Sequence, residues 1–248
     1  MTLEEFFMKY KKVALAYSGG IDSSYLLYMA KKYNVDVTAY FVKTEFQPNF
    51  AMKDCLRFAK KVDADLKIIA QNIIDNSDIV NNSSNRCYFC KKYFMNLIKT
   101  KAKEDGYEIL IDGTNFSDDE YDSPGTKALR EMNILSPLKM CSITQKDVIQ
   151  LSLKEGLDIE NKNSYSCLAT RVCEGEKITK KTFIQYWKTE AYLFSLSFRD
   201  FDLSVTNNTA VITVKKDDMD IVFKYRDKII IAMSPMFDNV YLNLNNKK

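Results

Sequence analysis

The chain has 248 residues, a formal net charge of +3, six cysteines and no histidine. A chain of this length can bury the core of one large domain, or of a medium domain with a small one beside it. The lack of histidine excludes Ser-His-Asp hydrolysis, Cys-His proteolysis and His-ligated zinc catalysis, and the interspersed charges give little support for a nucleic-acid-binding face.

The first half of the sequence alternates between strand and helix patterns. Thr2 and Glu5 can cap a short leading helix. Apolar runs and helical spacing then predict strands at 13–17, 37–42, 66–70 and 109–112, and helices at 23–33, 50–62 and 88–103. Such alternation predicts an α/β fold, with a mostly parallel sheet, helices on both faces and ligands at the carboxyl ends of the strands.

The second half is more varied. A capped helix is predicted at 144–154 and closes at Gly156, whereas residues 158–175 show no obvious regular element. Further predicted elements are a helix at 179–196, strands at 201–206 and 210–214 around an Asn207-Asn208 turn, and a strand at 240–244. We place a domain boundary near residues 175 to 180. The expected domains are 1–176 and a small α+β domain at 177–248, which would serve oligomerisation or substrate binding.

The first predicted strand leads into a loop rich in glycine and serine and then into an apolar helix. Gly19 and Gly20 allow the backbone to turn tightly and approach an anion, while Ser18, Ser23 and Ser24 add hydroxyl groups beside the amides of a helix N-terminus. An ordinary surface turn has a similar composition, but the strand before the loop and the helix after it are the context that a phosphate site requires. We therefore interpret the loop as a pyrophosphate cradle.

Residues 18–23 resemble the Ser-Gly-Gly-x-Asp-Ser signature of the PP-loop ATP pyrophosphatase superfamily. They do not form a Walker loop, because no Gly-Lys-Ser/Thr follows. The resemblance implies that the protein cleaves ATP between its α and β phosphates. Asp22 would help to hold Mg²⁺, and the alternative is that its carboxylate only caps the helix.

The cysteines suggest a second chemistry. Cys87 and Cys90 lie three residues apart at the predicted start of a helix, where both thiols can face one side. Such a pair fits half of a structural zinc site, a redox pair or two ligands of an iron–sulfur cluster. Cys167 lies in the irregular region near Arg171, and Cys173 is the nearest further candidate ligand. The simpler interpretation, a small apolar side chain, applies to Cys55, Cys141 and Cys173.

Five segments occur in the order and approximate spacing of the LarE-type ATP-dependent sulfur transferases: 18–23, 86–91, 112–115, 136–138 and 167–171. The similarity covers about residues 1 to 200. This family adenylates a carboxylate of a pyridinium dicarboxylate mononucleotide and inserts sulfur, during assembly of a nickel-pincer nucleotide. Some members give up the sulfur of one cysteine, whereas others hold a [4Fe-4S] cluster through three cysteines and use an extra sulfide on its open iron. With Cys87, Cys90 and Cys167 together, the chain resembles the cluster-bearing members.

The resemblance implies an AMP- and pyrophosphate-forming sulfurtransferase that uses ATP, Mg²⁺ and a [4Fe-4S] cluster with an extra sulfide. Its implied metal ligands are Cys87, Cys90 and Cys167, and its catalytic residues are Cys167 and Asp22. The implied ATP-binding residues are Ser18, Gly19, Gly20, Asp22, Ser23, Ser24, Asp112 and Asn115. Asp112 and Asn115 follow a predicted strand, and they either contact the nucleotide or cap the next turn. Arg86 and Arg171 would neutralise phosphate or carboxylate charge, and the alternative is that they are simply solvated.

Other expectations concern partners and location. We expect a small-molecule acceptor, sulfide or another sulfur donor, and a homo-oligomer as in related transferases, but no nucleic acid. No apolar run is long enough to cross a bilayer and no secretory signal is visible, so we expect a cytoplasmic protein without a membrane partner.

The chain also departs from the family pattern. Family members carry an Arg-x-Arg pair that is thought to hold the substrate phosphate, and Asp202 and Ser204 take these positions here. The alternatives are therefore a PP-loop thiolase acting on tRNA or another small molecule, an amide-forming PP-loop synthase with a structural zinc site, and a nucleotide-binding regulator without turnover.

Overall fold

The computed structural model describes residues 1–47, 49–119, 124–157, 167–198 and 201–245. The chain divides into two compact units. The first consists of Met1–Ile73 and Asn85–Tyr165, and the second of Ile74–Ser84 and Ser166–Lys248. The domain boundary near residues 175 to 180 stays a prediction, and each unit is described by itself.

A four-stranded parallel sheet forms the centre of the first unit. Its strand order is β3-β2-β1-β4. The strands are β1 (Lys12–Ala16), β2 (Asp36–Lys43), β3 (Asp65–Ala70) and β4 (Leu110–Asp112). In the register of the sheet, Ala14 of β1 lies between Thr38 of β2 and Leu110 of β4. These strands confirm the α/β fold and the parallel sheet expected from the alternating sequence pattern.

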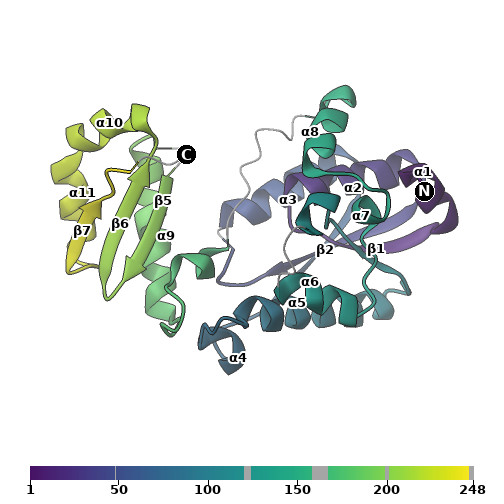
Figure 1. Ribbon diagram of the computed structural model, residues 1–248, viewed down its shortest axis with the longest axis horizontal. Helices are drawn as coiled ribbons and strands as arrows, with labels where there is room; N and C mark the ends of the chain where they lie inside the picture. The colour runs from purple at the N-terminus through teal and green to yellow at the C-terminus, as the bar shows by residue number, and fades with distance from the viewer. Residues whose placement is uncertain (48, 120–123, 158–166, 199–200, 246–248) are drawn as a thin grey trace. The chain divides into compact units, whose positions relative to one another are not determined.

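Helices cover both faces of this sheet (Figure 1). One face carries α1 (Leu3–Lys9), α2 (Ile21–Lys32), α3 (Asn49–Lys61), α7 (Pro137–Met140) and α8 (Gln145–Lys154). The opposite face carries α5 (Arg86–Glu104) and α6 (Pro124–Glu131). A 3-10 turn, η1 (Phe116–Asp119), follows β4. Within the described part of the chain, no helix is long and apolar enough to cross a membrane.

The central strand β1 shows how the two cores arise. Val13 and Leu15 pack with α1, α2 and α3, whereas Ala14 and Ala16 pack on the side of α5 and α6. All four side chains are buried, because successive side chains of a strand point to opposite faces of a covered sheet.

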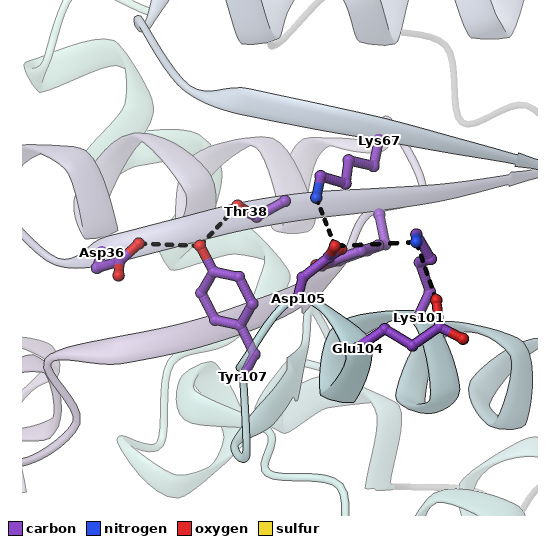
Figure 2. Close-up of polar contacts among 8 residues, drawn as sticks. Asp36, Thr38, Lys67, Lys101, Glu104, Asp105 and Tyr107 are labelled. Atoms are coloured by element: carbon purple, nitrogen blue, oxygen red, sulfur yellow. Dashed lines mark hydrogen bonds and ion pairs between the residues drawn. The ribbon is translucent and has the colours of Figure 1, made fainter.

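A polar cluster fixes the end of α5 to the sheet (Figure 2). Asp105 accepts hydrogen bonds from Lys67 of β3 (2.8 Å) and from the Tyr40 hydroxyl of β2 (2.7 Å). Tyr107 donates to Asp36 (2.9 Å) and shares a hydrogen bond with Thr38 (2.7 Å). The Lys67 and Tyr40 contacts lower the pKa of Asp105, so this carboxylate stays charged and holds β2, β3 and α5 together.

A mixed three-stranded sheet forms the second unit. Strands β5 (Phe201–Thr206) and β6 (Thr209–Val214) are antiparallel, and β7 (Asn239–Leu242) runs parallel to β6. The hairpin turn has φ of 48° at Asn207 and 57° at Asn208, as a type I′ turn requires, which confirms the predicted hairpin. The helices of this unit are α4 (Ser77–Val80), α9 (Lys180–Ser195), α10 (Met219–Lys224) and α11 (Arg226–Met233). Short 3-10 turns are η2 (Leu168–Arg171) and η3 (Lys216–Asp218).

The turn η2 corrects one expectation. Residues 158–175 were expected to lack regular structure, but residues 168–171 form a 3-10 turn whose Thr170 donates both its N–H (2.9 Å) and its hydroxyl (2.7 Å) to the Cys167 carbonyl. A 3-10 turn this short leaves no periodic pattern in a sequence. Residues 158–166 lie outside the described part of the chain.

An early segment of the chain belongs to the second unit. The side chain of Asn82 is buried and donates to the carbonyls of Val172 (3.3 Å) and Cys173 (2.7 Å). In return, the carbonyls of Asn82 and Val80 accept from the amides of Gly175 (2.9 Å) and Ile178 (2.8 Å). Residues 74–84 are therefore hydrogen-bonded to residues 172–178, which come much later in the chain.

Candidate functional site

The glycine-serine loop connects the carboxyl end of β1 to the N-terminus of α2. Gly20 is the N-cap residue of α2 and has no side chain to close the helix end. The Gly20 N–H donates to Ser18 Oγ (3.3 Å), and Ser18 Oγ shares a hydrogen bond with Ser23 Oγ (3.0 Å). The strand, loop and helix predicted from sequence are therefore confirmed, with two hydroxyls held beside the N-terminal amides of α2.

Position 19 requires glycine because of its backbone conformation and because of a neighbouring side chain. Its φ is +80°, and a Cβ at this position would lie 2.4 Å from Cys55 Sγ. Cys55 itself is 1% exposed and belongs to the core between α3 and the sheet, as expected for a small apolar side chain.

We expect Gly19→Ala to lower the free energy of unfolding by about 2–4 kcal/mol, because it combines a left-handed backbone with an overpacked contact. The measurement is urea unfolding of Gly19→Ala, Cys55→Ala and the double variant. The double variant should be more stable than the sum of the two single effects predicts. Strict additivity would show that the Cys55 contact does not restrict this position.

A cavity of about 200 Å³ opens beside this loop. Its lining residues are Ala16, Ser18, Gly20, Asp22, Ser23, Lys91, Asp112, Gly113, Thr114 and Asp118. Whole small-molecule pockets enclose about 300–1,000 Å³, so this loop cavity has room for phosphate groups rather than for a whole nucleotide. Sequence reasoning named Ser18, Gly20, Asp22, Ser23 and Asp112, and the structure brings these five together.

Asp22 is the most perturbed acid of the loop cavity. Its Oδ1 atom is buried and has no hydrogen-bond partner among the described residues. Burial raises the pKa of the Asp22 carboxyl to about 6, a hydrogen bond with Asn115 opposes this shift, and the charge of Asp118 adds to it. A buried carboxylate oxygen without a donor is a suitable ligand for a hard cation such as Mg²⁺.

Asn115 and Asp118 organise the turn after β4. Asn115 is 1% exposed; its N–H donates to Asp118 Oδ2 (2.9 Å) and its Oδ1 accepts from the Ser117 N–H (2.8 Å). Asn115 therefore caps the start of η1, which is one of the two interpretations the sequence allowed, while it also contacts Asp22. Its contact with a nucleotide stays a prediction.

Gly113 brings this turn close to α2. A Cβ on Gly113 would lie 2.9 Å from the backbone nitrogen of Ser23, so only glycine allows the approach. The turn after β4 therefore forms one wall of the loop cavity and the N-terminus of α2 forms another.

Lys91 is a cavity residue that sequence reasoning did not select. It lies one turn after Cys87 on α5, and its Nζ is 3.8 Å from Asp112 Oδ2. Its side chain is 35% exposed, against 3% for Asp112. A lysine beside helix amides and hydroxyls adds the positive charge that a polyphosphate site needs. The signal for Lys91 in the sequence was its position in the segment 86–91, but the two cysteines of this segment indicated sulfur chemistry instead.

Ser24 and Gly19 complete the predicted loop residues. Ser24 is fully buried, and its hydroxyl shares a hydrogen bond with the Tyr17 hydroxyl (3.1 Å). The role of both residues in ATP binding stays a prediction.

The paired cysteines lie on the first turns of α5, as expected. Cys87 is exposed and Cys90 is partly buried, and the Arg86 guanidinium lies 3.5 Å from Cys87 Sγ. Between them, the Tyr88 hydroxyl donates to Glu131 of α6 (2.5 Å). This contact fixes the start of α5 against α6 and leaves Cys87 at the surface.

Cys167 belongs to the second unit, where it precedes η2 as its N-cap residue. None of the six cysteines forms a disulfide, and the described residues contain no group of three or more Cys, Asp or Glu side chains placed to hold a metal ion. The three-cysteine cluster therefore stays a prediction.

Arg171 forms an ion pair with Glu190 of α9. The two side chains are 17% and 7% exposed, and the Tyr186 hydroxyl donates to the Arg171 carbonyl. Burial raises the pKa of Glu190, and the Arg171 charge opposes this effect. Arg171 therefore neutralises a buried carboxylate of its own unit, and its contact with a substrate anion stays a prediction.

We expect Arg171→Met to lower the free energy of unfolding at neutral pH by about 3–5 kcal/mol, because it leaves Glu190 buried without its partner. When folding raises the pKa of a carboxyl, the folded protein loses stability as pH rises from the pKa of the unfolded state to the pKa of the folded state. The defect should therefore be small near pH 4 and large at pH 8 in urea unfolding. Arg171→Met/Glu190→Gln is the control, and a defect that persists in it at every pH would contradict the explanation.

Asp202 and Ser204 lie on β5, and both side chains are exposed. The alternation of the strand instead buries Phe201, Leu203 and Val205. The positions at which the family pattern has arginines therefore face away from the core of the second unit.

The chain is similar in sequence to known proteins over most of its length. No family model matches the chain. An uncharacterized protein of Methanocaldococcus jannaschii is 30% identical over 237 residues, which cover 95% of this chain and 90% of that protein. The pyridinium-3,5-bisthiocarboxylic acid mononucleotide synthase of Lactiplantibacillus plantarum is 26% identical over 221 residues, 88% of this chain and 80% of the synthase.

The chain belongs to the LarE-like family. A further relative, an uncharacterized protein of Synechocystis, is 29% identical over 220 residues, 88% of this chain and 81% of that protein. The similarity therefore includes both units of this LarE-like chain, and the family predicted from five short segments is confirmed.

Proposed function

We propose that this LarE-like protein is an ATP-dependent sulfur transferase, which adenylates a carboxylate of a small acceptor and then replaces an oxygen of that carboxylate by sulfur. The observation that carries the proposal is the loop cavity. It joins the N-terminal amides of α2, the hydroxyls of Ser18 and Ser23, the ammonium of Lys91 and the Oδ1 of Asp22, which has no partner among the described residues. This donor set fits a polyphosphate with a bound divalent cation.

The residues have distinct roles in the proposed first step. Gly20, Ser18 and Ser23 bind the pyrophosphate part of ATP, and Lys91 neutralises charge that develops on the leaving group. Asp22 holds Mg²⁺, which spreads the charge of the phosphates when it is bound. An oxygen of the acceptor carboxylate attacks the α-phosphorus, the bond to the β-phosphate oxygen breaks, and the products are an acyl-adenylate and pyrophosphate.

The second step needs a sulfur nucleophile. Hydrosulfide attacks the acyl carbon, the carbon–oxygen bond to AMP breaks, and a thiocarboxylate, AMP and a proton result. Neither step requires histidine, because a carboxylate and hydrosulfide are deprotonated at neutral pH.

We assign the sulfur supply to Cys87, Cys90 and Cys167. Thiolates are the ligands that iron–sulfur clusters prefer, and the exposed Cys87 one turn before Cys90 suits a surface ligand pair. A [4Fe-4S] cluster bound by three cysteines would supply one iron without a protein ligand, where an extra sulfide can be held. Supply by the sulfur of Cys167 itself is the alternative source.

The relative from L. plantarum supports the class of acceptor. Its name describes the synthesis of a pyridinium bisthiocarboxylic acid mononucleotide, so we propose a pyridinium dicarboxylate mononucleotide or a related carboxylate as the acceptor. Asp202 and Ser204 lack positive charge, so a phosphate on this acceptor would be bound by other residues. We further propose that the protein works as a homo-oligomer and needs no nucleic acid.

The proposal is tested by anaerobic incubation of the purified protein with ATP, Mg²⁺, sulfide and candidate carboxylates. The expected result is equimolar AMP and pyrophosphate, together with a product in which sulfur replaces oxygen, identified by mass. Pyrophosphate without sulfur incorporation would favour an amide-forming synthase. Dehydroalanine at position 167 after one turnover would assign the sulfur to Cys167, and the lack of pyrophosphate with every acceptor would refute the proposal.

A further inference from the structure

Asp112 is the last residue of β4 and lines the loop cavity, yet neighbouring protein groups already donate hydrogen bonds to both of its carboxylate oxygens. Its side chain is 3% exposed. Oδ1 accepts from the Ser136 hydroxyl (2.7 Å) and the Thr114 N–H (3.2 Å), and Oδ2 accepts from the Thr114 hydroxyl (2.6 Å). Lys91 forms an ion pair with this carboxylate, with its Nζ 3.8 Å from Oδ2.

The backbone fixes Asp112 from the same side. Its N–H donates to the Leu135 carbonyl (2.9 Å), and the Leu135 N–H donates to the Leu110 carbonyl (3.1 Å). Leu135 thus continues the sheet beside β4, and Pro137 then starts α7. Ser136 lies between these two fixed elements, and its hydroxyl donates to Asp112.

These contacts argue against a direct bond between Asp112 and a nucleotide. Three donors occupy its oxygens, and a carboxylate repels the negative phosphates of ATP. The same charge attracts Lys91, the cavity residue whose ammonium suits a phosphate. Asp112 therefore contributes most by holding Lys91, and Ser136 by holding Asp112.

We propose that Ser136 is a positioning residue for Lys91 and acts through the Asp112 carboxylate. The inference rests on the proposed function, since the position of Lys91 matters to binding only if a polyphosphate enters the loop cavity. The segment 136–138 thereby has a role at the phosphate site. Asp112 holds Lys91 in place and does not contact the nucleotide itself.

A double-mutant cycle tests this inference. The variants are Ser136→Ala, Lys91→Met and the double variant, with Ser136→Thr as the conservative variant that keeps the hydroxyl. MgATP affinity is measured by titration calorimetry, and urea unfolding reports any purely structural effect.

We expect Lys91→Met to weaken MgATP binding about 30-fold and Ser136→Ala about 5-fold, since a charge-assisted contact is lost or misplaced. In the Lys91→Met background, Ser136→Ala should change the affinity by less than about twofold, while its effect on unfolding persists. Ser136→Thr should recover most of the affinity.

Two results would overturn the inference. An equal loss of affinity from Ser136→Ala in both backgrounds would show that Ser136 does not act through Lys91, as would a Ser136→Ala variant with wild-type affinity. No MgATP binding by the wild-type protein would be a separate outcome, because it refutes the proposed function and removes the premise of the inference.

Discussion

Asp22→Asn should strongly slow pyrophosphate release and at the same time stabilise the ligand-free protein at neutral pH. Folding buries the Asp22 carboxyl, raises its pKa to about 6 and leaves its Oδ1 without a donor among the residues that the structure describes. Loss of the negative ligand for Mg²⁺ should reduce the rate at least about 100-fold, the size of a lost transition-state contact in many enzymes.

The stability effect has a defined pH dependence. A carboxyl with a raised folded pKa binds more protons when folded, so the wild type loses stability as pH rises from about 4 to about 6. Asparagine does not ionise. The variant should therefore match the wild type near pH 4 and exceed it by about 1 kcal/mol above pH 6, after allowance for the partial exposure of Asp22.

Urea unfolding between pH 4 and pH 8 measures this difference. The control is Asp217→Asn, which removes an equal charge from an exposed position of η3. MgATP binding by the wild type should strengthen between pH 5 and pH 7, and in Asp22→Asn this gain should disappear. Normal pyrophosphate release by Asp22→Asn would contradict the metal role.

The second large effect concerns the paired cysteines. Cys87→Ala/Cys90→Ala should bind MgATP and release pyrophosphate like the wild type, but should lose sulfur transfer at least about 100-fold. Cys87 is exposed on the first turn of α5, and alanine is a good helix former, so we expect little change in unfolding.

Iron, acid-labile sulfide and zinc are measured after anaerobic purification. The wild type should hold about four iron atoms per chain and the double variant almost none. Cys141→Ala/Cys173→Ala is the matched control and should keep the iron. One zinc per colourless wild-type chain would refute the cluster, and an unfolded Cys87→Ala/Cys90→Ala variant would favour a structural site.

Much of the first unit could be predicted because its signals are local. The strand before Gly19, the helix after it and the capping boxes at Thr2 and Thr144 each depend on a few neighbouring residues. The cradle at Ser18 and Ser23 was predicted for the same reason.

What was missed depends on contacts between distant parts of the chain. Lys91 and Asp118 line the loop cavity only because the fold brings α5 and the turn after β4 to the carboxyl end of β1, where α2 begins. The hydrogen bond between Ser136 and Asp112 spans 24 residues. No periodicity identifies such pairs, so the sequence allowed Asp112 as a nucleotide contact or as a cap of the next turn, and it gave no role to Ser136.

The attachment of residues 74–84 to the second unit affects how the protein is made. Asn82 and Val172 lie 90 residues apart. At the usual speed of translation, roughly 5–20 s pass before the ribosome has added the segment that receives Asn82. During this interval the apolar Ile79 and Val80, which are 0% and 4% exposed in the folded protein, have no cover from that segment and are available to chaperones. A fragment that starts at residue 166 would also lack these residues, so we expect it to fold less stably than the second unit of the whole chain.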